Sequence, residues 1–316
     1  FSGDVDVTSN ILMSGEVFIK TNDGNGKVGI GLNAGATTQG NNAVAVGNQA
    51  GQYNQGESAV ATGQAAGRTS QGAYAVAVGN GAGQSTQRPG AVGVGVQAGF
   101  SNQGSYAVAV GNYTGRYNQG ARAVAAGIYA GYQNQGDYAV AVGDAAGSNN
   151  QSSYAVAVGT SAGQAAQGDN AVAVGRYAGN NNQADNSVAV GNAAGQITQG
   201  VNSVAMGINA GNNTQGAYAT AIGGTAAQVS QGTNATAVGY GTGLYNQGAS
   251  ATAVGYSAGN TSQGTSAVAV GNQAGQAAQG TESVAVGYTA GYTSQGNYAT
   301  AVGLNAGQTA QGLSAT

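Results

Sequence analysis

Short apolar segments recur along the chain at a fixed spacing. Residues 43–47 and 75–79 both read Ala-Val-Ala-Val-Gly, and residues 59–63, with the sequence Ala-Val-Ala-Thr-Gly, lie midway between them. The spacing is therefore 16 residues, and it holds without slippage from residue 25 to residue 312, which gives 18 copies. Numbered from 1 to 16 starting at Asn41, the consensus is x-x-A-V-A-V-G-x-x-A-G-x-x-x-Q-G. A fixed period of this kind predicts a repeat architecture.

Sixteen residues are too few for a helix pair or a propeller blade, but they suffice for one β-solenoid turn with two short strands. Positions 3 to 6 alternate between small and β-branched residues, which is typical of a strand. Gly recurs at positions 7, 11 and 16, where we expect corners with positive φ or close backbone approach. The sequence therefore predicts an all-β fold, a parallel β-solenoid (β-roll) whose 16-residue coils stack about 4.8 Å apart.

The alternation divides each strand into an inner and an outer face. We expect Val at positions 4 and 6 to fill the coil interior, which leaves Ala, Ser or Gly of positions 3, 5 and 7 on the outer face, with Lys27 as an exception. Burial of two Val side chains returns about 1.5–3 kcal/mol each, whereas ordering a residue costs about 1–2 kcal/mol. Because an isolated coil stack is marginal on these terms, we expect a second buried interface, with the small-residue face at a contact between chains or between sheets.

Position 15 is Gln in every copy. Amide side chains that repeat along a stack can bond to those above and below, as in Asn and Gln ladders. We therefore expect a structural Gln ladder, which consists of Gln39, Gln55, Gln71, Gln87, Gln103, Gln119, Gln135, Gln151, Gln167, Gln183, Gln199, Gln215, Gln231, Gln247, Gln263, Gln279, Gln295 and Gln311.

The segment before Asn25 does not follow the repeat. Residues 5–8 and 16–20 alternate like ordinary strands, with Ser14-Gly15 as a turn. We interpret residues 1–24 as a β lead-in or connector, residues 25–312 as eighteen solenoid repeats, and residues 313–316 as the start of a truncated further repeat.

Composition and charge exclude several classes of function. Lys and Arg total 7 and Asp and Glu total 10, and this net charge of −3 without a basic cluster argues against nucleic-acid binding. Cys and His are absent, which removes thiolate chemistry and His-based metal or acid–base sites. No apolar run approaches the length of about 18 residues that a membrane-spanning helix needs, so we expect no membrane insertion by this segment. Residues 24–29 fit the dinucleotide-binding motif G-x-G-x-x-G, but that motif needs a helix after it and no helix pattern follows. We therefore expect no cofactor. We also expect no metal and no enzymatic activity.

The repeat resembles the head repeats of YadA-like trimeric autotransporter adhesins. Their N-S-V-A-I-G units are matched closely by residues 186–191, Asn-Ser-Val-Ala-Val-Gly, and by residues 202–207, Asn-Ser-Val-Ala-Met-Gly. The 16-residue form with Asn-Gln-Gly, as in residues 51–56, is also similar to β-roll repeats in the fibres of phages and large DNA viruses. The resemblance implies a trimer of parallel β-rolls that is exposed on a cell or virion surface.

Exposed aromatics and breaks in the pattern are the candidate recognition features. Position 2 carries Tyr in several copies, and we select Tyr74, Tyr106, Tyr138 and Tyr154 as possible surface recognition residues for a host glycan or protein. Tyr138 and Tyr154 occupy adjacent coils and are expected to stack. The alternative is an aromatic ladder that shields the seam. Residues 88–90, Arg-Pro-Gly, break the usual corner and are interpreted either as surface variation or as a small binding feature.

Three functional classes remain. The leading hypothesis is a structural fibre shaft or adhesin head, extracellular on a cell or virion surface, that acts as a rigid spacer with a possible role in attachment. The alternative is an ice-binding β-solenoid, for which the regular ranks of Thr-x-Thr are missing. An enzyme on a β-helix lacks the convergent acid pair that its chemistry requires.

Overall fold

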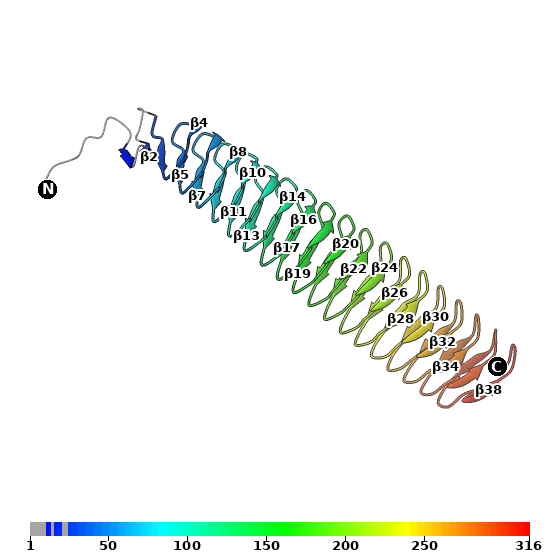
Figure 1. The fold of residues 1–316 in the computed structure, drawn as a ribbon. Coiled ribbons are helices and arrows are strands. Elements are labelled where there is room, and N and C mark those ends of the chain that lie inside the picture. The colour runs from blue at the N-terminus through cyan, green and yellow to red at the C-terminus, as the bar shows by residue number, and fades with distance from the viewer. Residues whose placement is uncertain (1–10, 14–15, 21–24) are drawn as a thin grey trace. The chain divides into compact units, whose positions relative to one another are not determined.

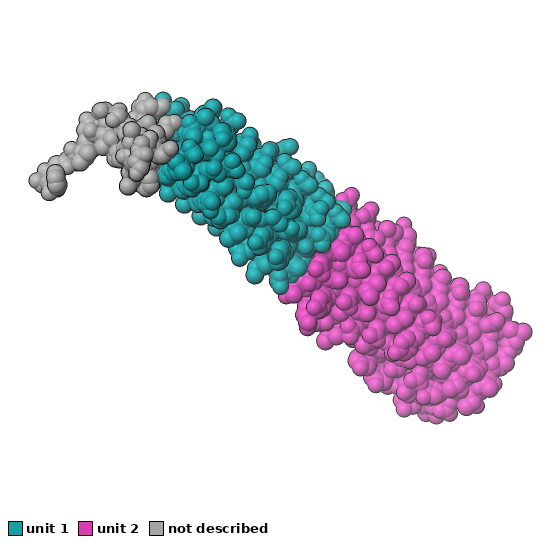
Figure 2. All heavy atoms as spheres, viewed as in Figure 1, with its two compact units in different colours: residues 1–154 teal, residues 155–316 magenta. Residues whose placement is uncertain are grey.

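The computed structural model describes residues 11–13, 16–20 and 25–316, and the fold is a parallel β-solenoid without a helix in those residues (Figure 1). The all-β solenoid predicted from the repeat is confirmed. The chain divides into two compact units, residues 1–154 and residues 155–316 (Figure 2). The expected strand over residues 5–8 and the turn at Ser14-Gly15 lie outside the described residues.

Unit 1 opens with a short antiparallel arrangement. Strand β1 (Ile11–Met13) pairs with β2 (Glu16–Lys20), and β2 pairs with β3 (Val28–Ile30), so that Ile19 lies opposite Ile30. The strand expected over residues 16–20 is therefore confirmed. From β3 onward every pairing in the described part of unit 1 is parallel.

Each complete coil of unit 1 contributes one strand to each of two parallel sheets. The first sheet, built from positions 4 to 6, consists of β3, β5 (Val44–Val46), β7 (Val60–Thr62), β9 (Val76–Val78), β11 (Val92–Val94), β13 (Val108–Val110), β15 (Val124–Ala126) and β17 (Val140–Val142). The second sheet, built from positions 13 to 15, consists of β4 (Thr37–Gln39), β6 (Tyr53–Gln55), β8 (Thr69–Gln71), β10 (Ser85–Gln87), β12 (Ser101–Gln103), β14 (Tyr117–Gln119), β16 (Gln133–Gln135) and β18 (Asn149–Gln151).

Unit 2 repeats the same plan. Its first sheet consists of β19 (Val156–Val158), β21 (Val172–Val174), β23 (Val188–Val190), β25 (Val204–Met206), β27 (Thr220–Ile222), β29 (Thr236–Val238), β31 (Thr252–Val254), β33 (Val268–Val270), β35 (Val284–Val286) and β37 (Thr300–Val302). Its second sheet consists of β20 (Ala165–Gln167), β22 (Asn181–Gln183), β24 (Ile197–Gln199), β26 (Asn213–Gln215), β28 (Val229–Gln231), β30 (Tyr245–Gln247), β32 (Thr261–Gln263), β34 (Ala277–Gln279), β36 (Thr293–Gln295) and β38 (Thr309–Gln311).

The register between neighbouring coils is one repeat at every pairing. Val108 pairs with Val124 and Gln119 pairs with Gln135, so each residue lies beside the equivalent residue of the next coil. Hydrogen bonds between coils continue through the corners, where the backbone N of Tyr138 donates to the carbonyl of Ala121 at 2.9 Å. Each coil is thus held by its neighbours over most of its backbone, as expected for a solenoid.

The Gly corners predicted from the sequence are confirmed. Gly127, at position 7, has φ 129°, and a Cβ atom there would lie 2.5 Å from the carbonyl oxygen of Gly143 in the next coil. Gly120, at position 16, has no positive φ, but a Cβ atom there would lie 2.4 Å from the carbonyl carbon of Gly136. Position 7 therefore needs Gly for both conformation and space, and position 16 needs it for space alone.

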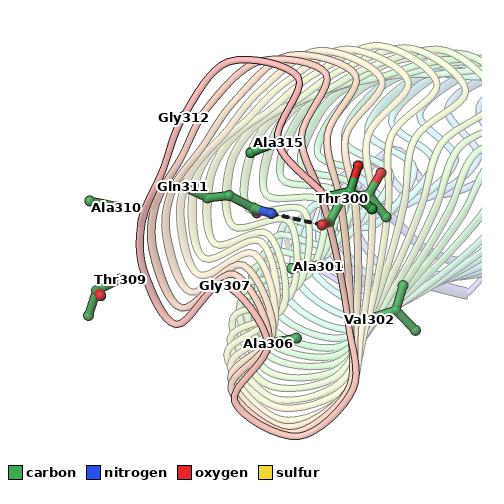
Figure 3. Close-up of a pocket in the computed structure, with 11 residues that line it drawn as sticks. Thr300, Ala301, Val302, Ala306, Gly307, Thr309, Ala310, Gln311, Gly312 and Ala315 are labelled. Atoms are coloured by element: carbon green, nitrogen blue, oxygen red, sulfur yellow. Dashed lines mark hydrogen bonds between the residues drawn. The ribbon is translucent and has the colours of Figure 1, made fainter.

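The prediction that Val fills the interior and Ala faces outward is wrong. The Ala residues of positions 3, 5 and 10 are almost all fully buried within a single chain, whereas no described side chain of positions 4 and 6 is buried. In the C-terminal coil, Ala301 and Ala306 point into the interior and Val302 points outward (Figure 3). The small-residue face therefore lies inside the coil, between its two sheets, so of the two contacts expected for it the contact between sheets is found and the contact between chains is not.

The narrowness of the coil explains this inversion. A Cβ atom on Gly131 would lie 2.7 Å from Oε1 of Gln135 and 3.2 Å from Cβ of Ala125. The two walls of the coil are therefore separated at this point by little more than a methyl group and an amide. Since a close-packed interior has no room for a γ-branched or β-branched side chain there, Ala must face inward and Val must face outward.

Candidate interaction surfaces

The Gln side chains of position 15 lie inside the coils. Between residues 55 and 295 their exposed fraction is 3% or less, and they are the largest side chains that are fully buried. Nε2 of Gln119 donates to the carbonyl of Val108 at 2.8 Å within its own coil and to Oε1 of Gln135 at 3.1 Å in the next. Each amide therefore ties the two sheets of one coil together and also connects adjacent coils.

Amide-to-amide hydrogen bonds run through the middle of each unit. In unit 1 they connect successive residues from Gln71 to Gln151, and in unit 2 from Gln167 to Gln263. Within the described residues five amide oxygens of this row are buried without a hydrogen-bond donor, namely Oε1 of Gln39, Gln55, Gln71, Gln279 and Gln295. In the C-terminal coil Gln311 reaches across the open hollow, about 580 Å³ in volume, to the carbonyl of Thr300 at 2.8 Å (Figure 3).

The outward side chains of positions 4 and 6 form an apolar surface on each unit, which we call the Val face. In the first sheet of unit 1, which runs from β3 to β17, the side chains at these positions are Val, Ile or Ala, apart from Thr62. In unit 2 the polar members are Thr220, Thr236, Thr252 and Thr300. All are half-buried or exposed, and Val110 has an exposed fraction of 43%. An extended apolar surface of this kind on a water-exposed sheet indicates an interaction site.

The four Tyr residues selected from the sequence lie along one corner of unit 1, in a row that we call the Tyr column. All four have φ near 59°, and successive coils between Tyr74 and Tyr154 place Gly90 and Arg122 in the same row. The predicted stacking of Tyr138 on Tyr154 is confirmed, with ring centroids 5.0 Å apart and ring planes within 5°. The Arg122 guanidinium lies over the Tyr138 ring at 5.3 Å and donates a hydrogen bond to its hydroxyl.

A cluster of aromatic rings around Arg116 was not found from the sequence. Cζ of Arg116 lies 4.7 to 5.7 Å from the ring centroids of Phe100, Tyr113, Tyr117 and Tyr132. Nη1 of Arg116 also donates to the Tyr132 hydroxyl at 2.8 Å. The signal was available, because Phe100, Arg116 and Tyr132 share position 12 and therefore stack.

A polar groove of about 470 Å³ lies at the same corner of unit 1 as the Tyr column. Arg88 and Asp137 lie along it, and Asn102, Asn118 and Gly120 form part of its lining. Nδ2 of Asn102 donates to Oδ1 of Asn118 at 3.0 Å, and Asn118 donates in the same way to Asn134 at 2.9 Å. Oδ1 of Asp137 accepts a hydrogen bond from the backbone N of Ala121 at 2.7 Å. Arg88 was singled out from the sequence, whereas the Asn column of position 14 was missed.

Two searches of the described residues gave negative results. Among residues 25–316, where side chains are described, no group of three His, Cys, Asp or Glu side chains is close enough to hold a metal ion. In the part of the chain that the structure describes, no helix has the length and apolar character needed to cross a membrane.

Comparison with known proteins supports the resemblance seen in the motifs. No curated protein matches the chain. The family model for the YadA head domain repeat matches residues 278–306 as two copies. This segment lies in unit 2, includes β35, β36 and β37, and has the same 16-residue register as the coils before it. The resemblance is thereby confirmed: residues 278–306 of this parallel β-solenoid match the YadA head domain repeat.

Proposed function

We propose that the chain is a segment of an extracellular surface fibre in which three copies pack their Val faces together. The observation that carries this proposal is the Val face itself. The interior of each coil is already filled by Ala methyl groups and Gln amides. The aliphatic side chains of positions 4 and 6 are therefore left in contact with water unless another surface covers them.

A second copy of the same chain is the occupant that fits this face best. The Val face repeats along the coils with the same 16-residue register as the strands below it, so an identical neighbour can match it coil by coil. The family match at residues 278–306 favours the same arrangement, because YadA-like repeats imply a trimer of parallel β-rolls. In such a trimer the shaft serves as a spacer, and attachment uses the variable positions that remain on the outside.

Charge substitutions on and off the Val face test the proposal. The test variant replaces four exposed aliphatic residues of position 6 with Glu, namely Val110, Val142, Val174 and Met206. The control variant replaces four exposed aliphatic residues of positions 1 and 8 with Glu, namely Val96, Ile128, Val201 and Ile208. Burial of unpaired carboxylates is strongly unfavourable, so sedimentation velocity should show monomers for the test variant and trimers for the control. Equal sedimentation of the two variants as trimers would refute the Val face as the contact.

A further inference from the structure

We infer that unit 1 has a binding site for a neutral polysaccharide chain, formed by the polar groove and the adjoining part of the Tyr column. The site comprises Arg88, Asn102, Asn118 and Asp137 of the groove together with Tyr106. The groove-lining Gly104 lies two residues before Tyr106 in the sequence, so the groove and the column share one corner of the solenoid. This function goes beyond that of a fibre shaft and does not depend on the Val face.

The groove offers unused hydrogen-bonding groups at regular intervals. Asn102 and Asn118 are exposed, and the hydrogen bond between them uses one N–H of Asn102 and one lone pair of Asn118. Because a primary amide has two N–H donors and two acceptor lone pairs, each member of this row keeps groups that face solvent. Such a row can accept hydrogen bonds from hydroxyl groups and donate to them, which is the pattern that a sugar chain requires.

The charges along the groove favour a neutral ligand. Arg88 and Asp137 carry opposite charges, and both are exposed. A hydroxyl group can accept a hydrogen bond from a guanidinium and can donate one to a carboxylate. An acidic polymer that bound along the whole groove would meet repulsion at Asp137, and a basic polymer would meet it at Arg88.

The Tyr column lacks one side chain beside this groove. Gly90 takes the place of a side chain between Tyr74 and Tyr106, and the Tyr106 ring lies close enough that a Cβ atom on Gly90 would be 2.6 Å from its Cδ1. Tyr74 and Tyr106 each have an exposed fraction of 63%, compared with 40% for Tyr138, which is stacked between Arg122 and Tyr154. The Tyr106 ring thus lies over Gly90 and keeps most of its surface exposed beside the groove, and aromatic surfaces with a polar hydroxyl suit amphipathic partners.

Retardation in native gels that contain soluble polysaccharides tests the inference. The neutral probes are β-glucan, galactomannan, xyloglucan, dextran and mannan, and polygalacturonate is the acidic comparison. The full chain should be retarded by at least one neutral polymer and more strongly than by polygalacturonate. Absence of retardation by all neutral polymers, or retardation by polygalacturonate alone, would overturn the inference.

Matched variants locate the site. Tyr106→Ser and Asn118→Ala should each weaken the retardation at least about fivefold. The fold accepts both changes, since Ser58 occupies position 2 and Ala166 occupies position 14 with the same backbone conformation. Tyr218→Ser and Asn182→Ala, at the equivalent positions of unit 2, should leave retardation unchanged. Equal losses in the unit 1 and unit 2 variants would also overturn the assignment.

Discussion

Nε2 of Gln183 donates a hydrogen bond to Oε1 of Gln199 at 3.2 Å, and the two residues are one coil apart in sequence. This contact is buried, and it lies in an interior where the other side chains are mainly Ala. The stability of each coil therefore depends on hydrogen bonds and close backbone packing more than on apolar side-chain burial. Substitutions at single residues of the coil can measure this balance.

Replacing Gln199 with Leu removes three donor contacts of its amide and one acceptor contact. Nε2 of Gln199 contacts the carbonyl of Val188 at 2.8 Å and Oε1 of Gln215 at 3.1 Å. Since a buried polar atom without its partner costs about 1–3 kcal/mol, Gln199→Leu should lower the free energy of unfolding by at least that amount. Chemical denaturation measures the change, and Gln133→Ile, at an exposed position that is Ile197 in another coil, is the control. Equal effects of the two substitutions would contradict the role of the buried amide.

Replacing Ala141 with Val tests which side of the strand is the interior. A Cβ atom built on Gly147 would lie only 3.2 Å from Cβ of Ala141, so the added methyl groups have no space. Overpacking of this kind costs about 1–3 kcal/mol. Ala126→Val, on the outward position 6, should be tolerated because most coils carry Val there. Thermal unfolding measures the stability of both variants. A loss of stability in Ala126→Val but not in Ala141→Val would indicate that Val, and not Ala, faces the interior.

Two glycines of a single coil should respond differently to replacement by Ala. Gly239 has φ 128°, and a Cβ atom there would lie 1.9 Å from the carbonyl oxygen of Gly255. Gly241 has φ 64°, its nearest contact would be 3.4 Å away, and Ala65 adopts the same conformation at this position. Gly239→Ala should cost more than about 2 kcal/mol, whereas Gly241→Ala should change stability by less than about 1 kcal/mol. Urea unfolding of both variants provides the measurement, and similar costs would argue against the coil spacing described above.

Replacing Arg116 with Gln should destabilise unit 1 through loss of its aromatic contacts. A cation–π contact contributes about 0.5–1 kcal/mol at an exposed site and more where it is desolvated, and the four rings share the one guanidinium of the half-buried Arg116, so the expected loss is about 1–2 kcal/mol. Arg68→Gln is the matched control, because Arg68 also occupies position 12 but bonds to Gln52 instead of aromatic rings. A melting temperature that falls equally in both variants would show that the rings add nothing.

The repeat length and the constant residues were sufficient to predict the solenoid. Gly at position 7 is constant because its φ and the carbonyl of the next coil exclude a side chain, and this constraint is visible in the sequence as a strict period. The stacking of Tyr138 on Tyr154 followed from the same period. Both features depend on spacing alone.

The direction in which each face points could not be read from the alternation. A period of two residues separates Ala141 from Val142 but does not say which of them is inside. That choice depends on the distance between the two walls of the coil, which is set by the backbone at Gly147 and by the amide of Gln151. The left-handed conformation of non-glycine residues such as Tyr138 was also missed, because side-chain type gives little indication of it.

The molar mass of the unmodified chain tests the central claim most directly. Light scattering on the 316-residue segment, measured across a dilution series, should give three times the 30.2 kDa of one chain. The Val face accounts for that mass, since three copies cover the apolar side chains that one copy leaves in water. A constant mass of 30.2 kDa at all concentrations, with the β-sheet circular dichroism spectrum intact, would contradict the proposal that the Val face joins the chains of the fibre.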